Sequence, residues 1–174
     1  METSFIITFI GDDRPGLVEE LSAVISDHQG NWLESRLSQL AGKFAGLIRV
    51  SLPSDRGALL EDALKQLSER GLSVRVHTLT EADTSASNER AIRLSIMGPD
   101  RPGIVREIAS ALARQAINVI DMHSDVSSAP MSAEQLFTAN VEAEIPASSD
   151  LDALTDTLEQ IANDMSVDVN MDLL

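Results

Sequence analysis

The chain has 174 residues, of which 43% are hydrophobic and 24% charged, a composition typical of soluble globular proteins. It contains no cysteine, which excludes disulfides, thiol nucleophiles and thiolate metal sites. Its net charge is −15, whereas proteins that bind DNA or RNA concentrate Lys and Arg on one face. We therefore expect no direct contact with nucleic acid.

The negative charge is concentrated in the second half of the chain. Residues 1–79 carry 8 basic and 11 acidic side chains, a net charge of −3, and residues 91–174 carry 4 and 14, a net charge of −10. The opening stretch, METSFIITFI, lacks a basic region, and its apolar run is too short for export or for spanning a membrane. We expect a cytoplasmic protein without a membrane segment.

The first 79 residues predict the order strand, helix, strand, strand, helix, strand. Alternation of Phe5, Ile7 and Phe9 predicts the first strand, which runs into GDDRPG at 11–16. The next elements are a helix with an apolar stripe, a strand after Asn31, a strand ending at Pro53, a second helix and a strand over 72–79. The helix stripes are Leu17, Val18, Leu21, Val24 and Ile25, then Leu60, Leu64 and Leu67.

The same order recurs after TEADTSASNER (80–90), a polar segment with the composition of a linker. At an offset of 87 residues GDDRPG is repeated as GPDRPG (98–103), and the apolar stripe of the helix recurs at 104–112. The offset grows to 93 around SSAPMSAE (127–134), so that Phe137 matches Phe44. A helix over 154–161 and a strand over 165–174 close the second copy.

We therefore predict two domains, 1–79 and 91–174, joined by a linker at 80–90. The order βαββαβ is that of the ferredoxin-like α+β fold, a four-stranded antiparallel sheet with two helices on one face. Each copy is small for an independent core. Ile6 and Ile10 lie on the face of the first strand that points away from the helices. We expect the two copies, or two chains, to pack on each other.

The repeated loop has the residue types of an anion site at the start of a helix. Gly11 and Gly98 would let the chain leave its strand with unusual backbone angles. The aspartates would cap the helices, and the glycines before the helices would let a ligand approach the N–H groups there. A carboxylate would bind these groups, and an aspartate would hold an ammonium. The candidate ligand residues are Asp13, Arg14, Gly16 and Asn31 in the first copy, and Asp100, Arg101, Gly103 and Asn118 in the second.

The same residues also have a purely structural interpretation. Asp, Pro and Gly make a good turn before a helix without any ligand, the arginines could pair with acidic neighbours on the surface, and the asparagines could begin strands. Asp12 adds a negative charge to the first loop where the second has Pro99. If the loops bind an anion, we expect the second loop to bind it better.

Residues that could carry other chemistry are sparse. His28, His77 and His123 fall on different elements without metal-ligand spacing, so we expect no metal site. The chain has no nucleophile elbow, P-loop or dinucleotide fingerprint. We therefore expect a protein that is not an enzyme and needs no cofactor.

Two copies of this fold, each with Asp-Arg-Pro-Gly at a strand-to-helix junction, resemble tandem ACT domains. The length of the chain and the SAPMS insertion before Phe137 are similar to the glycine cleavage system transcriptional repressor group. The resemblance implies a site between two paired domains that binds a small amino acid, with glycine suggested. It also implies contributions from the strand-to-helix loop and from Asn31 or Asn118.

Two functions follow. The first is a regulatory protein that binds an amino acid and passes the signal by protein contact, with a transcription factor as partner and a homodimer possible. The second is a constitutive adaptor that binds a partner protein without any metabolite. Thermal stability with and without amino acids distinguishes the two, because a ligand that binds only the folded state stabilises it.

Overall fold

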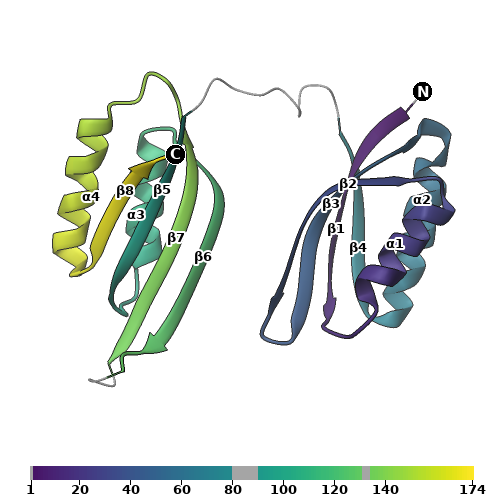
Figure 1. Cartoon of the computed structure of the whole chain (residues 1–174), viewed down its shortest axis with the longest axis horizontal. Coiled ribbons are helices and arrows are strands. Elements are labelled where there is room, and N and C mark those ends of the chain that lie inside the picture. Colours follow the sequence, from purple (N-terminus) through teal and green to yellow (C-terminus); the bar gives the residue numbers. More distant parts are fainter. Residues whose placement is uncertain (1, 80–89, 131–133) are drawn as a thin grey trace. The chain divides into compact units, whose positions relative to one another are not determined.

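The computed structural model describes residues 2–79, 90–130 and 134–174, and the chain divides into two compact units, Met1–Ser85 and Ala86–Leu174 (Figure 1). The predicted linker over 80–90 lies outside the described residues except for Arg90, which begins a strand. Among the described helices, none is long and apolar enough to cross a membrane.

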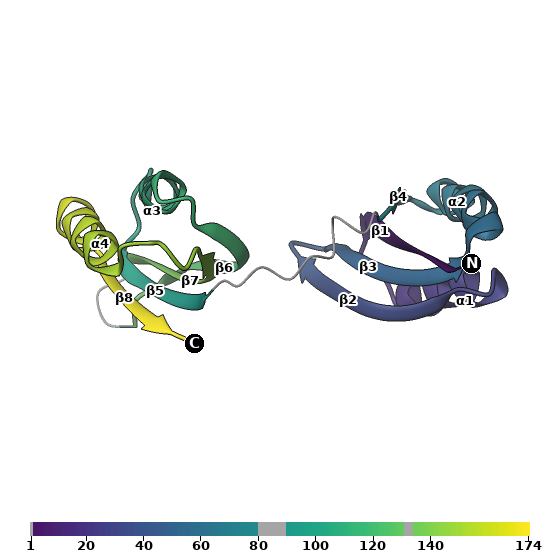
Figure 2. The same cartoon turned by 90° about the horizontal axis from the view of Figure 1, so that it is seen from above.

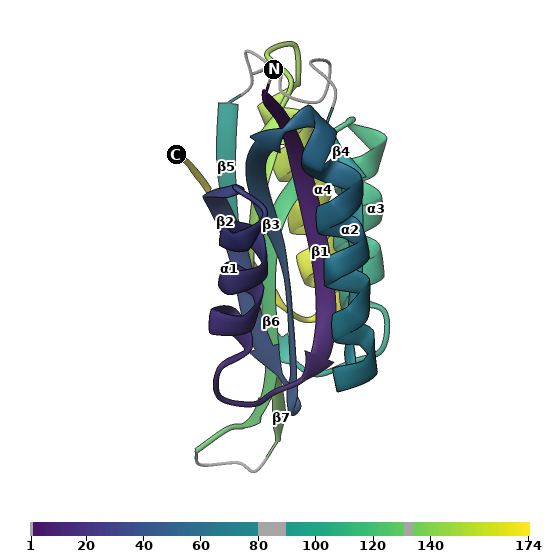
Figure 3. The same cartoon turned by 90° about the vertical axis from the view of Figure 1, so that its right-hand side faces the viewer.

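The first unit has the predicted order of elements. They are β1 (Glu2–Asp12), α1 (Leu17–Asp27), β2 (Asn31–Leu40), β3 (Lys43–Pro53), α2 (Gly57–Gln66) and β4 (Leu72–Thr78), with short 3-10 turns at Ser54–Arg56 and Leu67–Arg70. The strands form one antiparallel sheet in the order β2-β3-β1-β4. Helices α1 and α2 lie next to each other on one face of this sheet (Figure 3).

The second unit repeats the arrangement. Its elements are β5 (Arg90–Pro99), α3 (Ile104–Arg114), β6 (Asn118–Ser128), β7 (Gln135–Ile145), α4 (Leu151–Met165) and β8 (Asp168–Leu173). The sheet order is β6-β7-β5-β8, again antiparallel, and both helices lie on one face (Figure 2). The predicted ferredoxin-like α+β fold is thereby confirmed for both copies.

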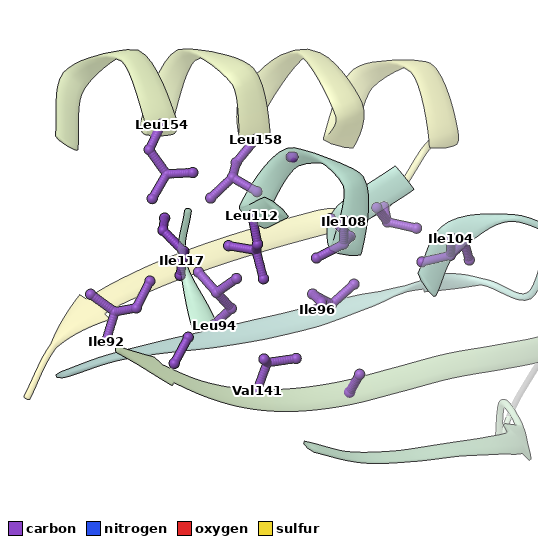
Figure 4. Close-up of a cluster of buried hydrophobic side chains, with 14 of the residues drawn as sticks. Ile92, Leu94, Ile96, Ile104, Ile108, Leu112, Ile117, Val141, Leu154 and Leu158 are labelled. Atoms are coloured by element: carbon purple, nitrogen blue, oxygen red, sulfur yellow. The ribbon is translucent and has the colours of Figure 1, made fainter. Parts of the chain in front are cut away.

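Each core lies between the sheet and its two helices. In the second unit Leu94 of β5 and Leu158 of α4 are buried in one cluster with the apolar stripe of α3 (Figure 4). The alternation seen in the sequence explains this, since every second strand residue faces the helices. In the first unit Ile7, Leu21 and Leu60 occupy the corresponding core.

Two element boundaries differ from the sequence prediction. The last strand was expected from residue 165, but α4 continues through Met165 and β8 begins at Asp168. Ser166 ends the helix with a left-handed backbone, φ 56°, a conformation that the period-two pattern does not reveal.

The connection between β6 and β7 covers residues 129–134, of which 131–133 lie outside the described residues, whereas Ala41 and Gly42 alone join β2 to β3.

Candidate functional site

The repeated loop joins the first strand of each unit to its first helix. Gly16 (φ 89°, ψ −1°) directly precedes α1, and Gly103 (φ 103°, ψ −11°) directly precedes α3. With a proline before it, each glycine has the angles of the third position of a type II turn, which favours glycine. A Cβ on Gly16 would meet no atom within 4 Å, and one on Gly103 would meet only the Cε of Met165 at 3.9 Å. The space beside both helix starts is open.

Neither helix has a side-chain cap at its start. The first helical hydrogen bonds run from the Glu20 N–H to the Gly16 carbonyl and from the Glu107 N–H to the Gly103 carbonyl, both 2.9 Å. The preceding N–H groups of the first turn donate no hydrogen bond to a capping side chain. Such groups, together with the helix dipole, favour an anion.

The prediction that Asp13 and Asp100 cap the helices is wrong. A capping aspartate would occupy the position that the glycine holds, three residues further along the chain. Instead, the Asp13 N–H donates to the Gly42 carbonyl (2.9 Å) and the Asp100 N–H to the Gln135 carbonyl (2.8 Å). These bonds fix the first loop to the connection between β2 and β3, and the second loop to the first residue of β7.

Gly11 and Gly98 also differ from expectation, because neither has a positive φ. Steric contact explains why glycine occupies both positions. A Cβ on Gly98 would lie 2.7 Å from the Val167 Cγ1 and 2.9 Å from the Ser166 carbonyl oxygen, and one on Gly11 would lie 2.8 Å from the Leu72 Cδ1. The glycines let the last strand of each unit approach the end of its first strand.

Arg14 and Asp12 of the first loop are paired within the protein. The Arg14 guanidinium donates to the Glu20 carboxylate at 2.6 Å, and Arg70 reaches the same carboxylate at 3.2 Å. The hydrogen bond from Arg14 lowers the pKa of Glu20. Asp12 is bound by Lys43, which lowers the pKa of Asp12. The negative charge of Asp12, expected to weaken anion binding, is therefore largely offset by Lys43.

The arginines at the second loop are not paired in this way. Within the part of the chain that the structure describes, Arg101 and Arg106 have no ionic partner. Arg106 stands where the 87-residue offset places Glu19 in the first unit. Both loops border shallow hollows, and the second is the more basic one. Its walls are Asp100, Arg101, Gly103, Ile104, Val105, Arg106, Val126 and Phe137; those of the first are Asp13, Arg14, Gly16, Leu17, Val18, Glu19 and Phe44.

Each hollow also has an aromatic wall, which is not among the candidate residues predicted from the sequence. Phe44 and Phe137 occupy matching positions of β3 and β7, and the repeat offset of 93 already related them. In the second unit the hollow adjoins an apolar pocket between α3 and β6, which shares Ile104, Val105 and Phe137 with it. A ligand at the second loop would therefore meet charge on one side and apolar surface on the other.

The structure does not bring the asparagines to the loop of their own unit. Asn31 begins β2 and shares a row of the sheet with Ser4, whereas the loop follows Asp12. Those rows are eight residues apart along β1, or about 26 Å at 3.3 Å per strand residue. Asn118 is related to its own loop in the same way. One unit alone can thus supply either the loop or the asparagine.

The described residues contain no group of three or more His, Asp or Glu side chains placed to hold a metal ion. Among those residues the structure places one histidine within 4 Å of a carboxylate, with His123 Nε2 lying 3.4 Å from Asp121 Oδ2. Two ligands on one exposed strand are too few for a structural site.

Comparison with known proteins gives matches to one domain family in both units. Residues 3–77 and residues 92–159 each match the ACT domain family. The UPF0237 protein MMP0657 of Methanococcus maripaludis is 30% identical over 79 residues, which are 45% of this chain and 81% of that protein. The UPF0237 protein MK1213 of Methanopyrus kandleri is 34% identical over 77 residues, 42% of this chain and 86% of that protein.

Two solved structures match over the whole chain. A protein of unknown function from Galdieria sulphuraria has a TM-score of 0.89 at 24% identity, covering 100% of this chain and 99% of its own. A candidate glycine cleavage system transcriptional repressor has a TM-score of 0.73 at 15% identity, and the match covers 100% of this chain and 98% of that protein. At these identities the likeness shows the shared fold. Because the two family matches fall one on each unit and together span most of the sequence, the chain belongs to the ACT domain family and carries two ACT domains in tandem.

Proposed function

We propose that the protein is a non-catalytic regulator that binds a small amino acid at its strand-to-helix loops. ACT domains are typically amino-acid-binding regulatory modules, and this chain consists of two of them. The observation that carries the proposal is the uncapped start of α1 and α3, each beside a glycine that faces open space. This arrangement suits the carboxylate of an amino acid.

The second loop offers partners for both charged groups of an amino acid. Its carboxylate would accept hydrogen bonds from the N–H groups at the start of α3 and would be attracted by Arg101 and Arg106. Its ammonium would be held by the Asp100 carboxylate, which is free of a capping role. Phe137 would contact its side chain. The first loop has the same backbone, but Glu20 already binds its arginine.

Asn31 and Asn118 would contribute from a different domain than the loop, because each lies at the far end of its own sheet from that loop. A complete site would therefore join two ACT domains, in one chain or in a homodimer. A ligand that bridges two domains binds one arrangement more tightly than others and so shifts their equilibrium. That shift is the signal we propose.

The proposed receiver of the signal is a cytoplasmic transcription factor, contacted through protein surfaces. A net charge of −15 opposes direct binding of nucleic acid. Glycine is the first ligand to test, because one structure with the same fold is a candidate glycine cleavage system repressor. The alternative function is an adaptor that needs no metabolite, and the internal pairing of Arg14 with Glu20 favours it for the first loop.

The test is a thermal-shift screen of the purified protein against the twenty amino acids. A ligand at 100 times its Kd adds about 2.7 kcal/mol of stability. We expect one or two amino acids to raise the Tm of the wild type, and Arg106→Ala to reduce that rise. Arg114→Ala is the matched control, since it removes the same charge from the other end of α3. Absence of any shift in the wild type would favour the adaptor.

A further inference from the structure

The apolar pocket between α3 and β6 is open to solvent at its rim and reaches the core of the second unit at its floor. Every residue that lines it is apolar. The floor includes the buried residues Ile96, Ile108, Leu112 and Val141, and the rim includes Val105, Val119 and Met122, which are 44%, 41% and 37% exposed. A small apolar group from outside the chain can therefore reach the edge of the core here.

In the first unit, larger side chains occupy the positions that match two walls of this pocket. The repeat and the strand register place Trp32 at the position of Val119, and the repeat places Phe9 at the position of Ile96. Trp32 packs against the core of the first unit, and the ring of Phe9 lies 5.7 Å from the ring of Phe44. The second unit thus has two smaller aliphatic side chains where the first has aromatic ones, and its pocket lies between them.

The pocket adjoins the charged hollow at the second loop. The two share Ile104, Val105 and Phe137 as walls. Along β6, Met122 lines the pocket and Val126 lines the hollow. Both face the side of the sheet that carries the helices, because strand residues an even number apart point to the same side. A ligand that spans the pocket and the hollow would therefore have one charged end and one apolar end.

We propose that the second unit binds an amino acid with an aliphatic side chain of the size of leucine, isoleucine or methionine, and that this side chain enters the apolar pocket. The inference rests on the proposed amino-acid site and specifies its ligand. Sites for small molecules combine apolar walls with a few polar groups that orient the ligand, and their volumes begin at about 300 Å³. This pocket, with a volume of about 300 Å³ including the space at its mouth, suits a single side chain.

The charges beside the pocket favour an amino acid over other apolar ligands. Arg101 and Arg106 in the wall of the hollow attract a carboxylate, and Asp100 attracts an ammonium, so an uncharged ligand would leave all three without a partner. A polar side chain is disfavoured, because its hydrogen-bonding groups would lie unpaired against apolar walls. Glycine has no side chain and would occupy only the hollow.

The size of the preference follows from the apolar surface that the ligand buries. Each methylene group that moves from water to an apolar wall increases affinity roughly fourfold. Leucine has several more carbon atoms than alanine, but the open rim of the pocket leaves part of the side chain in water. We therefore expect leucine, isoleucine or methionine to bind about tenfold more tightly than alanine or glycine, or better.

The first experiment is calorimetric titration of the wild type with leucine, methionine, alanine, glycine and isocaproate, which is leucine without its ammonium group. We expect leucine or methionine to bind most tightly, and isocaproate to bind more weakly than leucine. Equal affinity for leucine and glycine overturns this inference and leaves the proposed amino-acid site intact. Absence of binding by every amino acid overturns both. Tighter binding of isocaproate than of leucine overturns the assignment to an amino acid.

Filling the pocket tests its role. Val119→Trp introduces the side chain that the first unit has at this position, and we expect the affinity for leucine to fall to that for glycine while the affinity for glycine stays unchanged. Ile120→Trp is the matched control, because the neighbouring residue on β6 is 43% exposed and lines neither the pocket nor the hollow. It should bind leucine as the wild type does. A Val119→Trp variant that still prefers leucine overturns the assignment of the pocket.

Methyl NMR of the wild type locates the bound side chain without any substitution. Met122 lines the pocket, whereas Met97 follows Ile96 on β5 and therefore points to the opposite face of the sheet. With the methionine methyl groups labelled, we expect saturating leucine to shift the signal of Met122 and to leave that of Met97 in place. A Met122 signal that does not move when leucine is bound overturns the proposal.

Discussion

The guanidinium of Arg14 lies 2.6 Å from the carboxylate of Glu20, so the arginine of the first loop is bound within its own unit. The repeat places Arg101 and Glu107 at the matching positions of the second unit. No ion pair joins those two in the described structure. Loops with the same Asp-Arg-Pro-Gly sequence therefore differ in the charge they present to a ligand.

Replacing Glu20 by Gln should release Arg14 and make the first loop more similar to the second. We expect calorimetric titration with the amino acid that stabilises the wild type to show tighter binding at the first loop, because the guanidinium becomes available to the carboxylate. Asp27→Asn, which removes one negative charge at the other end of α1, is the control. Equal gains in both variants would mean that total charge, and not Arg14, controls binding.

The stability that Glu20 contributes should depend on pH. Hydrogen bonding by Arg14 lowers the folded-state pKa of Glu20 below its ordinary value of 4.5, so near pH 4 the unfolded state binds more protons than the folded state. The contribution is therefore complete above pH 4.5 and is lost as the pH falls through the folded-state pKa. We expect the difference in Tm between wild type and Glu20→Gln to shrink over that range. A difference that stays constant down to pH 3 would contradict this assignment.

The elements were predictable because each copy repeats two simple periods. Alternation in β1 and β5 and the apolar stripes of α1 and α3 each identify one buried face, and burial of one face is what a sheet and two helices require. The repeat also related Phe44 to Phe137, which line the two hollows.

The details of the loop were not predictable from the same signals. Asp13 has a residue type that suits a helix cap, but the left-handed backbone of Gly16 decides where the helix begins. The pairing of Arg14 with Glu20 requires both side chains to meet across the first turn of α1, which sequence spacing does not determine. The separation of Asn31 from the loop follows only once the strand register is known.

Two aspartates at helix starts should respond differently to substitution by alanine. The Asp150 carboxylate accepts hydrogen bonds from the N–H groups of Asp152 and Ala153, both 3.1 Å, and caps α4. Asp150→Ala should therefore reduce the free energy of unfolding by about 1 kcal/mol. Asp100→Ala removes no cap and should cost less than about 0.5 kcal/mol, as an ordinary surface substitution does.

Urea denaturation with amino-acid titration separates the two roles. We expect Asp100→Ala to keep its stability and lose the amino-acid response, and Asp150→Ala to keep the response and lose stability. A destabilised Asp100→Ala variant would mean that Asp100 supports the loop itself, and its assignment to the ligand ammonium would then be wrong.

Two glycines of the second loop should also differ in their response to alanine, although they lie five residues apart. Gly103 has a φ of 103° with open space around it, so Gly103→Ala adds backbone strain of about 1 to 2 kcal/mol. Gly98 has no positive φ, but a Cβ there would lie 2.8 Å from the Cα of Val167. Backbone atoms must move to admit it, and we expect Gly98→Ala to cost about 3 kcal/mol, the upper end for overpacking. Equilibrium urea denaturation checks the order, and a larger loss for Gly103→Ala would mean that β8 moves away from β5 more easily than its packing on Gly98 indicates.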